Sequence, residues 1–122
     1  MPAITFVTGD VLTAAQMNAI LDLAFNAQTG TTYTLVAADK NKLVTSSNGS
    51  AVTVTIPAGI FTAGQQVNIQ SIGVGLTTIS GGAVTITSTG ASAAAPILRA
   101  RYSSATVICT ASNVFTVVGD LA

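Results

Sequence analysis

The feature that most constrains this chain is residues 51–79, where apolar and hydroxyl side chains alternate in two segments separated by a proline. Three branched apolar residues alternate with threonines in the first segment: Val52, Val54 and Ile56. A strand with this period has one apolar face and one hydroxyl face. Pro57 ends the segment because it has no N–H for a β-ladder, and the alternation resumes at Val67 and Ile69. The stretch predicts a β-unit with one packed face.

The same alternation recurs on both sides and predicts eight or nine strands about ten residues apart. The expected strands are residues 32–36, 42–45, 51–56, 67–71, 76–79, 84–87, 97–102, 106–111 and 114–118. This spacing is typical of β-sandwiches, jelly rolls and small barrels, and connections this short favour antiparallel neighbours. We predict a mainly β domain over residues 31–122, an antiparallel β-sandwich or jelly-roll-like fold of 8–9 short strands.

Two connections in this domain have specific predictions. Asn48-Gly49 is a hairpin signal, because both residues tolerate the positive φ of a type I′ turn. Gly73-x-Gly75 lacks the third glycine and the helix of a dinucleotide-binding fingerprint, so it is predicted to be a turn. The corner after Pro57 contains Ile60 and Phe61, which we expect to form a packed lid.

Residues 1–30 follow a helical period instead. Thr13 and Gln16 have the spacing of a capping box. Four apolar residues then recur on one helix face: Met17, Ile20, Leu21 and Ala24. We therefore expect an N-terminal arm and one short helix that ends near Asn26, with Gln28-Thr29-Gly30 as the linker to the β domain.

This helix needs a partner surface. A helix of about a dozen residues is marginal on its own, so its apolar stripe is expected to dock on its own sheet, a sister subunit or another protein. The predicted contact residues of the N-terminal segment are Leu12, Met17, Ile20 and Leu21.

The composition points to association with other chains. The chain has 122 residues, which suits one domain, and 49% are hydrophobic but only 7% are charged. A soluble domain typically has about 25% charged residues, so we expect serines and threonines to cover the outside and apolar surface to be buried against other subunits. The last strand is apolar on both faces and needs a cover on both. The predicted interface includes Ile108, Val114 and Val118.

The residue types argue against catalysis. The chain has no histidine and no glutamate, which are common general bases and metal ligands. The four acidic residues are far apart in sequence: Asp10, Asp22, Asp39 and Asp120. Cys109 has no activating base nearby in sequence and is expected to be a buried thiol. We predict no catalytic, cofactor-binding or metal-binding residue, and a protein that is not an enzyme.

Arg99 and Arg101 are two positions apart and are followed by Tyr102. On the predicted strand 97–102 the two arginines would share a face, where they could contact an anionic or sugar ligand. The alternative is an exposed polar face that pairs with aspartates.

Other partners are not expected. Zero net charge and four scattered cations give too few phosphate contacts for nucleic-acid binding. No apolar run approaches the ~20 residues of a membrane helix, and Met1 to Ile4 lack the basic start of a signal peptide. We expect synthesis in a cytoplasm without a signal peptide and without membrane insertion.

Two parts of the chain contain short motifs that recur in known proteins. Residues 6–18 contain the run Gly9-Asp10-Val11-Leu12-Thr13-Ala14, which leads into a short helix with Asn18. This stretch resembles an N-terminal segment of tailed-bacteriophage virion structural proteins, especially fibre-like and capsid decoration proteins. The β part is similar to phage modules with a Thr-Tyr-Thr-Leu opening, an Ile-Pro corner and a Gly-Asp-Leu end, here Thr32–Leu35, Ile56-Pro57 and Gly119–Leu121. Phe115 stands where such modules often have tryptophan.

The resemblance implies a virion structural protein, commonly a homotrimer, whose partners are the major capsid protein or a tail component. Two interpretations remain. The chain is a capsid decoration or cement protein attached through its N-terminal segment, or it is a tail-fibre, head-fibre or spike module that recognises a host surface glycan. The short chain without a repetitive shaft favours decoration. The low aromatic content favours it too, because sugar sites usually need rings.

Overall fold

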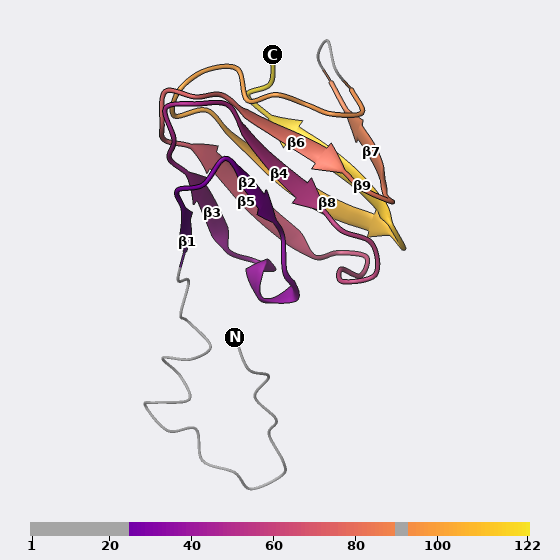
Figure 1. The fold of residues 1–122 in the computed structure, drawn as a ribbon. Coiled ribbons are helices and arrows are strands. Elements are labelled where there is room, and N and C mark those ends of the chain that lie inside the picture. The colour runs from indigo at the N-terminus through magenta and orange to yellow at the C-terminus, as the bar shows by residue number, and fades with distance from the viewer. Residues whose placement is uncertain (1–24, 90–92) are drawn as a thin grey trace, which may run out of the picture.

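The computed structural model of this chain describes residues 25–89 and 93–122. Within them the chain forms nine strands and one short 3-10 helix, η1 (Ala37–Asp39), as Figure 1 shows. The strands are β1 (Asn26–Gln28), β2 (Thr32–Thr34), β3 (Leu43–Ser46), β4 (Val52–Ile56), β5 (Gln66–Ser71), β6 (Thr77–Gly81), β7 (Thr85–Ser88), β8 (Ser104–Ala111) and β9 (Val114–Gly119). The prediction of a mainly β fold is confirmed.

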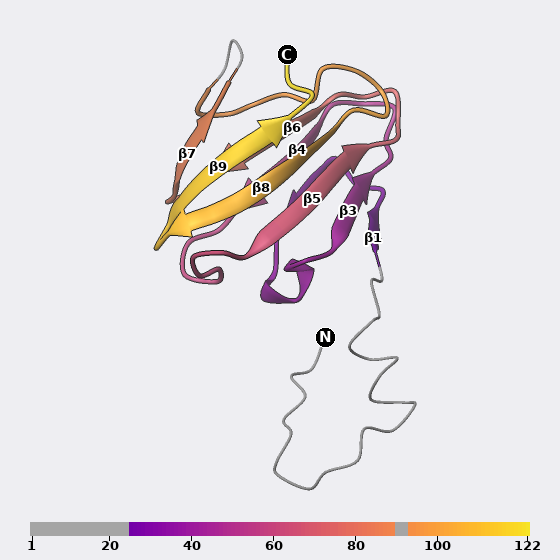
Figure 2. The ribbon, with the colours of Figure 1, turned by 180° about the vertical axis from the view of Figure 1, so that it is seen from behind.

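The strands form two facing sheets. The six-stranded sheet has the order β1-β3-β5-β8-β9-β7, and the three-stranded sheet has the order β2-β4-β6. Figure 1 shows the three-stranded sheet in front, and Figure 2 shows the six-stranded sheet from the opposite side. From β1 to β7 successive strands alternate between the two sheets, so the chain winds as a flattened solenoid. We call each turn of this winding, from one strand of the six-stranded sheet to the next, a coil; the first coil runs from β1 to β3.

The predicted antiparallel pairing is wrong for most of the domain. Among the described strands five of the seven pairs are parallel, and only the pairs β5 with β8 and β8 with β9 are antiparallel. The short connections cross from one sheet to the other instead of joining neighbours within a sheet. Alternation identifies a strand with one buried face, but it does not say whether the next strand lies beside it or opposite it.

The predicted Asn48-Gly49 hairpin is wrong for the same reason, because β3 and β4 lie in different sheets. Asn48 has no positive φ. Its side-chain carbonyl accepts a hydrogen bond from the Ser50 N–H at 2.9 Å, and its amide donates to the Thr29 carbonyl at 2.8 Å. These contacts hold Asn48 at a corner of the coil and tie that corner to the one before it.

Gly73 and Gly75 form the next corner, stacked on the Asn48 corner. The Gly75 N–H donates to the Asn48 carbonyl at 2.9 Å. A Cβ on Gly73 would lie 2.4 Å from the Asn48 nitrogen, and one on Gly75 would lie 1.9 Å from the Ser50 carbonyl oxygen. The predicted turn is confirmed, and the close approach of two backbones is the reason for both glycines.

Successive coils stack in register. Val44 pairs with Ile69 and Val54 pairs with Ile79, each pair 25 positions apart in sequence. All four side chains are fully buried between the sheets. The first coil is shorter, since Asn26 pairs with Val44, 18 positions along the chain. The repeat therefore places equivalent apolar residues on top of one another in the core.

The core lies between the sheets and contains the predicted apolar faces. Val52, Val54 and Ile56 are at most 1% exposed, whereas the threonines between them are partly exposed. Phe61 is buried at the corner after β4 and meets Phe115 edge-on, with ring centroids 6.1 Å apart. The predicted faces of this strand and the packed lid at Phe61 are confirmed.

The predicted strand 97–102 is wrong. Ile97 and Leu98 make only isolated β-bridges, and the chain then turns at residues 101–102. The segment 96–98 lies along the edge of β6, to which it is joined by two backbone hydrogen bonds of 2.8 Å. These apolar residues therefore cover the last edge of the three-stranded sheet instead of forming a strand of their own.

The predicted helix lies outside the described residues for most of its length, but its expected end does not. Asn26, where the helix was expected to end, begins β1, and Gln28 of the predicted linker ends it. β1 pairs in parallel with β3 and forms one edge of the six-stranded sheet. A strand of three residues is too short to show an alternation in the sequence. The domain boundary expected at residue 30 lies between β1 and β2.

Candidate functional site

Residues 99–103 form the turn between the segment 96–98, which lies along the edge of β6, and β8. We call it the 99–103 turn, and it contains Arg99, Arg101 and Tyr102. Since this segment is not a strand, the two arginines do not share a strand face as expected. The Tyr102 N–H donates to the Ser71 carbonyl at 2.6 Å, and the Ser71 N–H donates to the Ser103 carbonyl at 3.0 Å. The turn is thereby tied to the end of β5.

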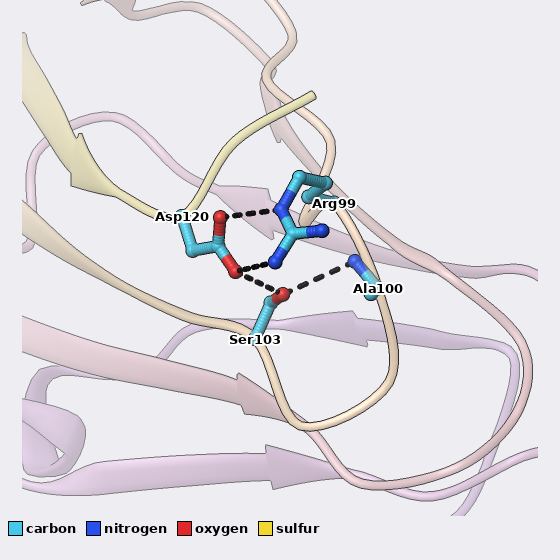
Figure 3. A network of polar contacts seen from close by, with 4 residues as sticks. All are labelled: Arg99, Ala100, Ser103 and Asp120. Atoms are coloured by element: carbon cyan, nitrogen blue, oxygen red, sulfur yellow. Dashed lines mark hydrogen bonds and ion pairs between the residues drawn. The ribbon is translucent and has the colours of Figure 1, made fainter.

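A network around Asp120 stabilises the base of the turn (Figure 3). The Arg99 guanidinium donates through Nε to Asp120 Oδ1 at 2.7 Å and through Nη2 to Oδ2 at 3.0 Å. The Ser103 hydroxyl donates to Oδ2 at 2.7 Å and accepts from the Ala100 N–H at 3.1 Å. Arg99 thus follows the alternative interpretation, an exposed arginine paired with an aspartate.

The same contacts affect protonation. The hydrogen bonds from Arg99 and then Ser103 hold the pKa of Asp120 below its usual value, and the Asp120 carboxylate raises the pKa of Arg99. Both side chains are largely exposed, so solvent screens the ion pair and its main effect is to fix geometry.

Arg101 and Tyr102 form the exposed tip of the turn. The Arg101 Nε donates to the Ile72 carbonyl at 3.0 Å, and its guanidinium carbon lies 4.9 Å from the centroid of the Tyr102 ring. Tyr102 is 60% exposed and has a φ of 69°. This pair has two aligned groups, an aromatic ring and a guanidinium, with much of their surface open to solvent.

The predicted interface residues fall into two groups. Leu12, Met17, Ile20 and Leu21 lie outside the described residues. Ile108 in β8 and Val114 and Val118 in β9 all lie on the outer face of the six-stranded sheet, with Val118 49% exposed. The structure brings these last three together on two adjacent antiparallel strands.

The outer face of the six-stranded sheet, in the part of the chain that the structure describes, has no charged side chain. Its members alternate with the inward-facing residues of each strand. They are Ala27, Leu43, Thr45, Gln66, Asn68, Gln70, Thr85, Thr87, Ser104, Thr106, Ile108, Thr110, Val114, Thr116 and Val118, of which Thr45 is itself buried. The outer face of the three-stranded sheet differs, because its members are all hydroxyl residues: Thr32, Thr34, Thr53, Thr55, Thr78 and Ser80. Apolar groups are thus concentrated on one of the two outer faces.

Another polar cluster, around Asp39, was not predicted from the sequence. Asp39 is 2% exposed, and its carboxylate accepts hydrogen bonds from the Tyr33 hydroxyl at 2.6 Å, the Asn26 amide at 3.0 Å and the Val36 N–H at 3.0 Å. Burial, followed by the hydrogen bond and the charge of Asp39, raises the pKa of Tyr33 to about 12. These contacts join β1, β2 and η1, which all belong to the first coil, so the cluster has a structural role.

The described residues contain no group of acidic, histidine or cysteine side chains that could hold a metal ion. Cys109 is buried, as predicted, and its thiol donates to the Ala111 carbonyl at 3.1 Å. No helix among the described residues has the length and hydropathy needed to span a membrane. No protein-family model and no curated protein sequence matches this chain.

Proposed function

We propose that this protein is a structural component of a tailed-bacteriophage virion, an oligomeric and specifically trimeric decoration or cement protein. It joins the particle through its N-terminal segment and contacts other copies through the β domain. The resemblance of residues 6–18 to phage virion proteins supports the assignment to a virion. The observation that carries the proposal is the uncharged outer face of the six-stranded sheet, which supports association with other copies.

An uncharged sheet face suits permanent association. Ile108, Val114 and Val118 present apolar surface among threonines, and no charge has to lose its water when a second copy covers them. Threonine and amide side chains at the same face can form hydrogen bonds across the contact. A face of this kind is uncommon on a monomeric domain, because soluble domains have about 25% charged residues and rarely expose large apolar patches.

The proposal is tested by changing one residue of this face. Ile108→Lys puts a charge at the centre of the face, where its long side chain can still reach water, so the domain should fold but remain monomeric. Thr53→Lys, on the outer face of the three-stranded sheet, is the matched control and should behave like wild type. Analytical ultracentrifugation measures the mass of each variant, and circular dichroism verifies its fold.

A wild-type chain that sediments as a monomer at micromolar concentration would contradict the proposal. The same holds if Ile108→Lys stays folded and fully oligomeric. Electron microscopy of labelled particles then distinguishes the two virion locations, because a decoration protein covers the shell and a fibre or spike occupies the tail or a vertex.

The second candidate, a receptor-binding module of a tail fibre, head fibre or spike, is favoured by one observation. The exposed Arg101–Tyr102 pair is held on a turn with many hydrogen bonds, an arrangement suited to contact a ligand. In this case labelled particles would carry the chain at the tips of fibres or spikes.

A further inference from the structure

The position of Tyr102 is unusual for its residue type. Among the described residues three that are not glycine have a positive φ: Asn41 at 60°, Tyr102 at 69° and Asn113 at 57°. Asparagine tolerates this conformation because its short side chain bonds to the local backbone, whereas an aromatic residue there is strained. A turn that served only to reverse the chain would be more stable with asparagine or glycine at position 102.

Packing does not explain the tyrosine. The residue is 60% exposed, and neither its hydroxyl nor its ring is needed in the core. Strained residues persist where the surrounding structure holds them, and they cluster at binding sites. The surroundings of Tyr102 do hold it: its N–H and carbonyl bond to Ser71 and Gln70, and the Asp120 network fixes the base of the turn. The ring is therefore displayed in a fixed position.

Arg101 adds a second group at a fixed position. Its Nε is used by the Ile72 carbonyl, and its guanidinium covers one face of the Tyr102 ring. Within the described part of the chain, its two terminal amino groups make no hydrogen bond, so they remain free to donate. A guanidinium edge presents two parallel donors, which match a carboxylate. Tyr102 is 60% exposed, so ring surface remains for stacking beside the guanidinium.

We propose that the 99–103 turn binds a carboxylate-bearing saccharide. The apolar C–H face of a pyranose ring stacks on the exposed ring surface of Tyr102, and the sugar carboxylate accepts two hydrogen bonds from the terminal amino groups of Arg101. The Asp120 carboxylate does not repel the ligand, because Arg99 and Ser103 neutralise and occupy it. This proposal does not depend on the oligomeric or virion role.

The test measures binding of trigalacturonate and of N-acetylneuraminic acid to the purified full-length chain by calorimetry, with maltotriose as the neutral control sugar. Tyr102→Asn removes the ring and keeps a residue suited to the positive φ, so it should unfold at the same temperature as wild type or higher while binding is lost. Arg101→Gln should weaken binding about tenfold to hundredfold, the loss expected for a charge-assisted contact.

Lys40→Gln is the matched charge control, since Lys40 is exposed and follows η1 in the first coil. It should bind the acidic sugars like wild type. Failure of the wild-type chain to bind either acidic sugar overturns the proposal, as does equal loss of binding in Lys40→Gln. If Tyr102→Asn changes only the sedimentation of the chain, the ring contacts a protein and the saccharide assignment is wrong.

Discussion

At the scale of single residues, Asp39 shows how a chain with few charges can bury one of them. Among the described residues no cation forms a salt bridge with this carboxylate, but three donors surround it: Tyr33, Asn26 and the Val36 N–H. Hydrogen bonds to an ionised group are stronger than neutral ones and offset much of the cost of burying it. The three donors come from β1, from β2 and from the residue that precedes η1, so the cluster ties the first coil together.

The raised pKa of Tyr33 leads to a prediction about alkaline stability. Its unfolded pKa is about 10 and its folded pKa is about 12, so between these values the unfolded chain loses the proton first. The contribution of Tyr33 to stability is therefore complete below pH ~10 and is lost as the pH rises through its folded pKa. Ultraviolet titration of the phenolate, with Tyr33→Phe for comparison, should show one late ionisation that this variant lacks. A Tyr33→Phe chain with an unchanged late step would contradict the assignment.

At the scale of elements, the corners decide how the coil stacks. Gly75 lies so close to the Ser50 carbonyl that any side chain must push the two corners apart, which also strains the bond from the Gly75 N–H to the Asn48 carbonyl. Parallel coils need such close corners, because β3 and β5, like β4 and β6, must keep their pairing on both sheets at once.

Because the two corners are so close, Gly75→Ala should lower the free energy of unfolding by roughly 1–3 kcal/mol, the usual cost of overpacking. Gly49→Ala is the control: it lies at the neighbouring corner, and the nearest heavy atom to its new Cβ is 4.0 Å away. Urea denaturation of both variants measures the difference. Equal stability of the two variants would show that the corners have room to separate.

At the scale of the whole molecule, the two ends of the coil are built differently. The edge of β6 is covered by residues 96–98, and the β8–β9 hairpin continues the six-stranded sheet. At the other end, β1 and β2 are the edge strands of their sheets, and Phe25, the first described residue, immediately precedes β1. The N-terminal segment thus joins the β domain at the first coil.

Deletion of residues 1–24 tests the proposed anchor. All nine described strands are retained, so the truncated chain should give the β-rich circular dichroism of the full chain. If residues 1–24 attach the protein to the particle, purified virions should no longer contain the truncated chain. Leu21→Asp in the full-length chain should have the same effect, because Leu21 belongs to the predicted contact stripe. Normal incorporation of the truncated chain would rule out this anchor.

The sequence by itself determined the class of structure and the buried face of its strands. Val52, Val54 and Ile56 alternate with threonines, and a period of two has one physical meaning: one side of a strand is packed and the other is not. The same local logic located the turn at Gly73 and Gly75 and the buried thiol of Cys109. Each of these depends on neighbours a few positions away in the chain.

Only the tertiary structure decided how the strands pair. Parallel coils and antiparallel hairpins bury the same alternating faces, so the pattern around Asn48 is compatible with both, and the choice depends on contacts between residues about 25 positions apart. The Asp39 cluster and the 99–103 turn have the same origin. Tyr33 of β2 meets Asp39 of η1, and Arg99 of the 99–103 turn meets Asp120 just after β9, because the folded path of the chain brings these segments together. No local periodicity in the sequence records such an encounter.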